Sequence, residues 1–221
     1  MDISDKTEFT YTAILKDIIR NVYDQSSIIT EKSLLNKYQV SRSPVREALL
    51  MLCNEEILQS VPRVGYRIKP ISIKGIKDAI ALRLIIEQAA MEIYFPKLTD
   101  KNIDKLEELY KKGEEIEKEQ DAFIHWNLNK EFHLTLTAMS GNSYYTKTLE
   151  KIMKQCFRGA SQYYGESWEN NLHREDMRWH RKLIDALKNK DSVEANKILC
   201  NDINDYLCSF NTFPTLGLDK A

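Results

Sequence analysis

Apolar residues recur along most of this chain at the spacing of amphipathic helices. In the first seventy residues this spacing predicts three helices, over about 11–23, 30–38 and 43–55. Residues 1–9 are polar, and we expect them to be frayed. Beyond the third helix, apolar and polar residues alternate on both sides of the segment 62–65, which predicts a small β-hairpin over 58–68.

After residue 70, apolar residues recur at helical spacing alone, without the alternation typical of strands. We predict a linker at Pro70-Ile71-Ser72, with Ser72 as the cap of the helix that follows. Six helices are predicted, over about 73–94, 98–119, 121–139, 143–164, 172–188 and 192–210. The sequence therefore predicts a mainly α protein, with one domain over residues 1–70 and an all-α six-helix domain over residues 71–221.

The composition narrows the class of protein. Of 221 residues, 43% are hydrophobic, and the scarcity of glycine (7) and proline (5) agrees with a helical chain. The formal net charge of −1 excludes a general basic bias, although a small module inside a neutral chain can still be locally basic. The four cysteines form no CxxC pair, and no segment resembles a signal peptide or a membrane span. We therefore expect a cytoplasmic protein without membrane contact.

The third predicted helix opens with the run Ser41-Arg42-Ser43-Pro44-Val45-Arg46-Glu47-Ala48-Leu49. We expect Ser43 to cap this helix and Pro44 to lie in its first turn. Arg42 and Arg46 then lie at the positive end of the helix dipole, where a polyanion binds well, and arginine can also read guanine. Three helices followed by a basic hairpin is the order of a winged helix-turn-helix. A plain three-helix bundle with solvated arginines is the alternative, which the placement of Arg42, Arg46, Arg63 and Arg67 disfavours.

The segment from Ile29 to Ile68 resembles the DNA-binding domain of the GntR family of bacterial transcription regulators. The resemblance rests on Glu31, Leu34, the run Val40–Leu49 and Gly65. It implies that DNA contacts come from Lys32, Ser41, Arg42, Ser43, Arg46, Arg63 and Gly65. The chain departs from the family at Glu56-Ile57, where a glycine usually follows the acidic residue, so we expect the third helix to end differently.

The six predicted helices resemble the FCD-type ligand-binding domain of the FadR subfamily. The matching pieces are Leu82-Arg83-Leu84-Ile85-Ile86-Glu87, Glu131-Phe132-His133 with Gly141-Asn142, and His180 with Ile184, Ala186-Leu187 and Asp191–Ala195. This resemblance implies a domain that binds a small effector and supplies dimer contacts.

Four side chains of this domain are candidate metal ligands. Asn129 and His133 are one helical turn apart, and His180 and Asp202 lie on later helices that can face the same interior. The subfamily usually has one aspartate and three histidines, and the resemblance places Asn129 at the aspartate and Asp202 at the third histidine. Such a set suits Zn, Ni or Mn. The alternative is that the histidines are only hydrogen-bonded in a polar core; His125 and His173 are possible substitute ligands.

Arg83 is the main candidate for effector binding. It lies in an otherwise apolar helical stretch, and a buried arginine requires a partner. That partner is either an internal acid such as Glu87 or the carboxylate of a bound small molecule. Arg158, in the middle of a later helix, is a second candidate.

Our leading hypothesis is a homodimeric transcription regulator, a repressor that binds a palindromic operator in double-stranded DNA. A small organic acid in the helical domain would control it, with a divalent metal as an optional partner. A metal-dependent enzyme using His133 and His180 is an alternative, but it lacks a clear general base, so we predict no enzyme. An effector-independent DNA-binding protein is a further alternative.

Overall fold

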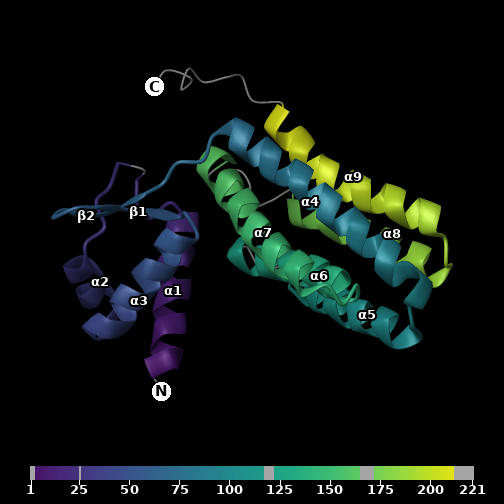
Figure 1. The fold of residues 1–221 in the computed structure, drawn as a ribbon, viewed down its shortest axis with the longest axis horizontal. Coiled ribbons are helices and arrows are strands. Elements are labelled where there is room, and N and C mark those ends of the chain that lie inside the picture. The colour runs from purple at the N-terminus through teal and green to yellow at the C-terminus, as the bar shows by residue number, and fades with distance from the viewer. Residues whose placement is uncertain (1–2, 25, 117–121, 165–171, 212–221) are drawn as a thin grey trace. The chain divides into compact units, whose positions relative to one another are not determined.

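The computed structural model describes residues 3–24, 26–116, 122–164 and 172–211. The chain divides into two compact units, which are described separately. The first consists of Met1–Ser72 with Arg158–Glu166, and the second of Ile73–Phe157 with Ser167–Ala221. Figure 1 gives the elements of both units in chain order.

The first unit has three helices and a hairpin, as predicted. The elements are α1 (Ile3–Ile19), α2 (Glu31–Tyr38), α3 (Arg42–Asn54), β1 (Leu58–Val61) and β2 (Gly65–Ile68). The two strands are antiparallel, with Leu58 opposite Ile68 and Val61 opposite Gly65. Ile29, just before α2, adds a bridge to β2: its N–H donates to the Tyr66 carbonyl at 2.7 Å and its carbonyl accepts from the Tyr66 N–H at 2.8 Å.

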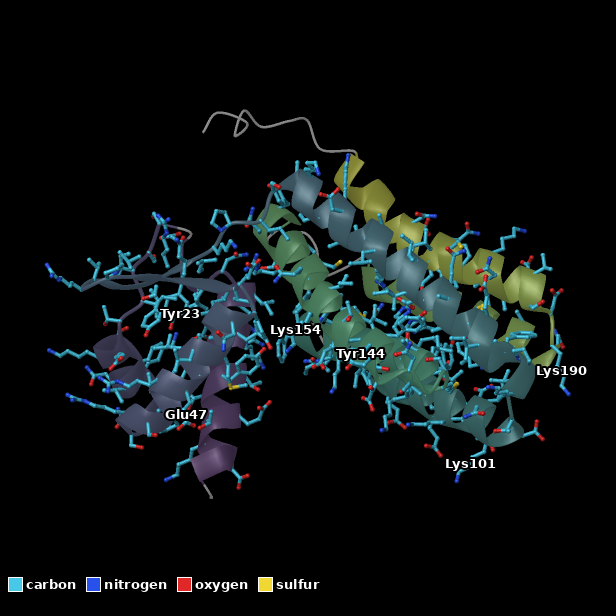
Figure 2. All side chains as sticks on the ribbon, in the orientation of Figure 1. Tyr23, Glu47, Lys101, Tyr144, Lys154 and Lys190 are labelled. Carbon is cyan, nitrogen blue, oxygen red and sulfur yellow. The ribbon has the colours of Figure 1, made fainter. Side chains whose placement is uncertain are left out.

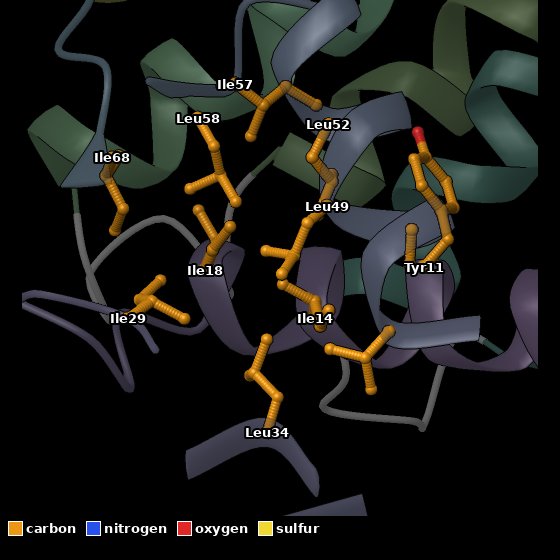
Figure 3. Close-up of a cluster of buried hydrophobic side chains, with 12 residues drawn as sticks. Tyr11, Ile14, Ile18, Ile29, Leu34, Leu49, Leu52, Ile57, Leu58 and Ile68 are labelled. Atoms are coloured by element: carbon orange, nitrogen blue, oxygen red, sulfur yellow. The ribbon is translucent and has the colours of Figure 1, made fainter. Parts of the chain in front are cut away.

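One hydrophobic core holds this unit together, and every element contributes to it (Figure 3). Its fully buried members include Ile14 of α1, Leu34 of α2, Leu49 and Leu52 of α3, and Leu58 of β1. Burying an aliphatic side chain of this size contributes about 1.5–3 kcal/mol before entropy is counted. The core therefore fixes α3 against α1 and the hairpin, and the opposite side of α3 is left to solvent.

The prediction for the N-terminal segment was wrong. α1 begins at Ile3, not near residue 11, and it ends at Ile19. The early threonines are buried: the Thr7 hydroxyl donates to a Glu47 carboxylate oxygen at 2.8 Å, and the Thr10 hydroxyl donates to the Lys6 carbonyl at 2.6 Å. These bonds satisfy both buried hydroxyl groups, and Thr7 lies in the segment 1–9 for which a frayed structure was expected.

Two helix starts test the capping predictions. Thr30 caps α2 as expected, and it forms a capping box with Ser33. Ser43 does not cap α3: the N-cap is Ser41, whose backbone is extended, and helical geometry begins at Arg42. The Ser43 hydroxyl instead donates to Glu47 at 3.1 Å. Pro44 still lies in the first turn, where its missing N–H costs no helical hydrogen bond.

The end of α3 has an unusual backbone. Glu55 is the C-cap, and Glu56 then adopts a left-handed conformation with φ of 59°. The family resemblance placed a glycine after the acidic residue, at Ile57, whereas the left-handed residue is Glu56. A residue with a Cβ is strained in that conformation, so the chain keeps the turn at a cost in stability.

The second unit contains the six predicted helices, with ends that agree within a few residues. They are α4 (Ile73–Tyr94), α5 (Asp100–Glu115), α6 (Ala122–Ala138), α7 (Ser143–Tyr164), α8 (Leu172–Lys188) and α9 (Ser192–Asn211), and a short 3-10 helix, η1 (Phe95–Lys97), follows α4. The last turns of α7 belong to the first unit. The predicted extension of the second of these helices to residue 119 lies outside the described residues.

Packing within this unit brings distant helices together. α4 packs on α6 and α9, α5 packs on α6 and α8, and α8 packs on α9. Lys190, labelled in Figure 2, lies in the turn that reverses the chain between α8 and α9. Among the described residues, no helix is long and apolar enough to cross a membrane.

Candidate functional site

The start of α3 is an exposed surface rich in hydroxyl and guanidinium groups. Ser41, Arg42, Ser43 and Arg46 are all exposed, whereas Pro44 and Val45 are buried beneath them. Backbone N–H groups and the positive end of the helix dipole are directed to the same place. This arrangement suits a phosphate backbone.

Arg46 is oriented by an acid on the neighbouring helix. Its Nε lies 3.0 Å from each carboxylate oxygen of Glu31, the first residue of α2. The capping box at Thr30 fixes the backbone of α2 at this point. Both contacts use the Nε–H, so the two Nη groups of Arg46 are available to another acceptor. Sequence reasoning identified Arg46 but not this role of Glu31, because the two residues are fifteen positions apart.

The hairpin lies next in the same unit. Arg63 is exposed at its tip with φ of 65°, and Arg67 donates to the Gln59 side-chain carbonyl across the strands, at 3.2 Å from Nε and 2.9 Å from Nη2. Gly65 has φ of 148°, and a Cβ there would lie 2.6 Å from the Ile29 carbonyl oxygen. The bridge between the hairpin and Ile29 therefore requires glycine at position 65. The sequence alone did not reveal this close approach of the two backbones. Lys32 is exposed on α2.

A second candidate site lies inside the helical unit. His133 of α6, His180 of α8 and Asp202 of α9 are buried, and one ligand atom of each lies within 4.8 Å of the others. Nε2 of His133 is 3.4 Å from Nε2 of His180 and 3.1 Å from Oδ2 of Asp202. The ring of Phe132 stacks on His180, with centroids 3.8 Å apart, and holds that imidazole in place.

Behind His133 lies a buried acid. Nδ1 of His133 is 2.7 Å from a Glu87 oxygen, and Nε of Arg83 donates to the other Glu87 oxygen at 2.6 Å. The carboxylate therefore favours a proton on Nδ1 and directs Nε2 of His133 towards His180 and Asp202. Arg83 is therefore paired with Glu87, the internal acid that was one of the two partners expected for it.

The charges of this group are interdependent. Burial alone would lower the pKa of His133, but the Glu87 carboxylate outweighs it and raises the pKa to about 9. Burial lowers the pKa of His180 to about 3, against the attraction of Asp202. Burial would raise the pKa of Asp202, but the contact with His133 keeps that pKa below its ordinary value. Without a metal, a protonated His133 therefore lies between two carboxylates and a neutral His180.

The residues present fit a metal ion. Within the described part of the chain, Asn129 Oδ1 is buried without a hydrogen-bond partner, and the buried Asp202 Oδ2 has its ion-pair contact with His133. Ligands bound to one ion at about 2.1 Å lie roughly 3.0–3.4 Å apart, which matches the separations around Nε2 of His133. The group of His133, His180 and Asp202 could hold a metal ion, and Asn129 offers a weaker amide oxygen beside the cavity described next.

A small cavity adjoins His180 and Asn129. Its lining comprises Leu109, Gly113, His125, Leu128, Asn129, Phe132, Met177 and His180. The Met177 side chain lies against Gly113 so closely that a Cβ at Gly113 would come within 2.5 Å of the Met177 sulfur. Nε2 of His125 is 3.0 Å from the Ile116 carbonyl oxygen, and His125 does not join the metal-binding group. The side chain of His173 lies outside the described residues.

Arg158 has a different environment. It belongs to the first unit, where its Nη1 donates to the Glu56 carbonyl at 2.7 Å. Burial lowers its pKa to about 10, against a small opposing effect of Glu56. The structure thus gives Arg158 a backbone partner near the end of α3.

A winged helix-turn-helix followed by a helical domain with a buried group of histidines and carboxylates is the architecture of a transcription regulator. The chain matches the family of bacterial regulatory proteins named gntR over residues 6–68 and the FCD domain over residues 78–205. It belongs to the GntR family and carries an FCD domain, which is a ligand-binding domain. It is a regulator and not an enzyme.

Similar proteins agree with this assignment. An uncharacterized HTH-type transcriptional regulator of Bacillus subtilis is 27% identical over 85% of this chain and 83% of its own length. The Uxu operon regulator of Haemophilus influenzae is 26% identical over 86% of this chain and 77% of its own. The solved structure of McbR/YncC from E. coli has the same fold, with a TM-score of 0.78 at 19% identity over 96% of this chain and 98% of that one.

Proposed function

We propose that this regulator is a cytoplasmic repressor that inserts the start of α3 into the major groove of a palindromic operator. The observation that carries the proposal is the exposure of Arg42 and Arg46 at the positive end of α3, in the same unit as the hairpin. Phosphate contacts would come from the serines and the helix dipole, and base contacts from the guanidinium groups. The DNA-contacting set is Lys32, Ser41, Arg42, Ser43, Arg46, Arg63 and Gly65, within a domain over residues 1–70.

The helical domain, residues 71–221, would bind a small organic acid. Asn129, His133, His180 and Asp202 would hold a divalent ion such as Zn, Ni or Mn, and Arg83 and Glu87 would keep His133 oriented towards it. Such an ion, when it replaces the proton on His133, adds one positive charge to a buried group that is otherwise balanced, which favours an anionic ligand. Arg83 and Arg158 are the proposed effector-binding cations.

Control would follow from differential binding. Two copies of the chain would place two α3 helices on the two halves of the operator. An acid that binds one arrangement of the helical domain better than another shifts the population of the two arrangements, and the acid and the operator then change each other's affinity by the same factor.

Two experiments test this function. In the first, a duplex selected by the wild-type chain from a random library is used in mobility-shift titrations at fixed salt. Selective binding supports the proposal; equal affinity for the selected duplex and for a scrambled one refutes it. In the second, chelator-stripped protein is titrated with Zn, Ni or Mn chloride, and both bound metal and thermal unfolding are measured. His180→Ala should abolish binding and the thermal shift, whereas the matched control His125→Ala should retain them.

The alternative of effector-independent binding has its own outcome. It is favoured if the selected duplex binds tightly while neither metal ions nor a panel of small carboxylic acids changes that affinity or the unfolding temperature. The proposed repressor predicts that at least one acid of the panel changes the duplex affinity.

A further inference from the structure

Gly113 lies in the last turn of α5 and is buried. Glycine weakens a helix relative to alanine, and this one does not have the left-handed backbone that favours glycine where helices end. Its reason lies on α8. A Cβ at Gly113 would come within 2.5 Å of Sδ and 2.7 Å of Cε of Met177, so the thioether end of Met177 fills the place of a side chain.

Met177 also lines the small cavity beside His180 and Asn129. The volume of this cavity is about 10 Å³, which holds roughly one water molecule. Within the described residues, Oδ1 of Asn129 is a buried acceptor without a hydrogen-bond partner. Because buried polar atoms are normally satisfied, this oxygen indicates that a further group binds in the cavity.

The lining of the cavity has an inner part and an outer part. The inner residues are buried, and they are Leu109, Gly113, Asn129, Phe132 and His180. The outer residues are half-buried, and they are His125, Leu128 and Met177. The outer part is therefore where the cavity approaches solvent.

Of the three outer residues, Met177 is the one that moves most easily. Nε2 of His125 is held 3.0 Å from the Ile116 carbonyl oxygen, and Leu128 has a short, branched side chain. Met177 is unbranched, with three rotatable bonds and an apolar end. It lies on the same side of α8 as His180, one turn earlier, so its movement uncovers that imidazole.

We propose that Met177 is the gate of this cavity, and that an acid reaches His180 and Asn129 only by displacing its thioether end. The inference rests on the proposed function, to which it adds a limit on the size of the acid. The displaced Cγ, Sδ and Cε, together with one water, leave space for roughly four or five non-hydrogen atoms. A carboxylic acid with two or three carbons has that size, and one with five carbons does not.

The first test measures access to the cavity without any acid. Chelator-treated full chain is reacted with diethyl pyrocarbonate, which acylates neutral imidazoles and is far larger than water, and modification of His180 is followed by peptide mass spectrometry. Met177→Ala should accelerate this modification at least tenfold. Met177→Leu, which conserves most of the volume, should stay near the wild-type rate.

The matched control is Met139→Ala, which truncates a half-buried methionine outside the lining and should leave the rate unchanged. Far-UV circular dichroism checks that every variant keeps the wild-type helix content. Should Met177→Ala lose helix content, Met177→Val, which also lacks Sδ and Cε, takes its place.

The second test measures the size limit. The full chain, supplied with zinc chloride, is titrated calorimetrically with the sodium salts of the straight-chain acids from two to six carbons. The wild type should bind acetate and propionate, and its affinity should fall beyond three carbons. Met177→Ala should instead gain about fourfold in affinity with each added methylene up to pentanoate, because the truncated side chain leaves apolar space for them.

Two results would overturn the gate: equal rates of His180 modification in the wild type and Met177→Ala, and a wild type that binds pentanoate as tightly as acetate. If no acid binds any variant, the effector role in the proposed function fails, while the modification rates still decide whether Met177 closes the cavity. If acids bind the wild type and Met177→Ala with the same size preference, the effector role stands and the gate is refuted.

Discussion

Glu31 holds Arg46 through Nε, with both carboxylate oxygens 3.0 Å away. The carboxylate is partly buried, with 31% of its side chain exposed, against 60% for Arg46. Glu31 thus orients the guanidinium of Arg46 in the absence of DNA. The side-chain entropy that Arg46 would lose on binding DNA is therefore smaller. Glu31 is a positioning residue in this role.

Glu31→Gln should therefore have two opposite effects on DNA binding. Removing a negative charge beside the phosphates raises affinity for scrambled duplex. Releasing Arg46 lowers discrimination between selected and scrambled duplex, by about fivefold to tenfold, within the roughly 1–3 kcal/mol that a bidentate base contact contributes. Titrations of both duplexes at several salt concentrations measure this.

Two further variants separate the explanations. Arg46→Ala should lose the same discrimination, and adding Glu31→Gln to it should cause no further loss. Glu8→Gln on α1 removes an equal charge elsewhere and should leave discrimination unchanged. If Glu31→Gln weakened both duplexes by the same factor, its role would be only structural.

Gly65→Ala should destabilise the hairpin. The substitution adds strain at φ of 148° and places a Cβ 2.6 Å from the Ile29 carbonyl oxygen, so the bridge to Tyr66 must break. We expect a loss of about 2–3 kcal/mol, the sum of backbone strain and a disrupted buried contact. Calorimetry of the first unit's transition measures it.

The control for this change is Gly141→Ala, at φ of 74° with open space around the added Cβ. It should cost only the strain of about 1–2 kcal/mol, in the second unit. Equal losses at the two glycines would mean that the approach to Ile29 does not matter. All three tryptophans come after residue 72, so fluorescence does not follow the first unit and circular dichroism or calorimetry is needed.

Glu56→Gly should stabilise the chain. Glycine removes the strain of the left-handed backbone at φ of 59°, although it also loosens the unfolded chain, so we expect a net gain of about 0.5 kcal/mol. The ion pair with Lys69, at 3.3 Å between exposed side chains, contributes little. Glu56→Ala is the control, because it removes the same pair but keeps the strain. A gain in the alanine variant would assign the effect to the side chain.

Arg83→Ala should be strongly destabilising. Arg83 and Glu87 are buried, and removing one partner leaves the Glu87 carboxylate with only His133 to balance it, for which about 3–5 kcal/mol is expected. Denaturant unfolding followed by tryptophan fluorescence measures this. If the free energy of unfolding fell by less than about 1 kcal/mol, the pair with Glu87 would not stabilise the fold, and Arg83 would be free to serve mainly as an effector-binding residue.

The network around Glu107 makes stability depend on pH. Hydrogen bonds from Arg181, opposed by partial burial, lower the pKa of Glu107 to about 2, and Lys188 also contacts the carboxylate. A lowered folded pKa gives stability that is present above the unfolded pKa, near 4.3, and is lost as pH falls towards 2.

Wild type should therefore exceed Glu107→Gln by about 1 kcal/mol at pH 7, less than the full shift implies because Arg181 and Lys188 are partly exposed. The difference should vanish near pH 2. Glu108→Gln, at the exposed neighbouring position, should show no such pH-dependent difference. A constant difference from pH 7 to pH 2 would exclude the ionised Glu107 as its source.

Local signals in the sequence were enough to predict much of this fold. The cap at Thr30, the hairpin around Gly65 and the span of α4 depend on neighbours within a few positions, and all three match. The predicted start of α1 does not match, because the hydroxyl group of Thr7 is hydrogen-bonded by Glu47, forty positions away in the sequence. Spacing within α3 also could not distinguish Ser41 from Ser43 as the cap.

The candidate site shows the same limit. The sequence grouped Asn129, His133, His180 and Asp202, and ligand atoms of His133, His180 and Asp202 lie within 4.8 Å of one another. It did not place Glu87 behind His133 or direct Leu82 and Ile85 outward, since both depend on how α4 rotates against α6 and α9. Which side of a helix is buried is decided by tertiary packing and not by its neighbours in the sequence.

Glu87 and Ile85 are two residues apart on one rigid rod, one facing the histidines and the other facing away. A change in the rotation of α4 at the histidine group therefore also moves the side chains on the exposed side of the same helix. Under the proposed function, an ion or acid bound at the histidines would be read out on the far side of α4 without any contact between the two places.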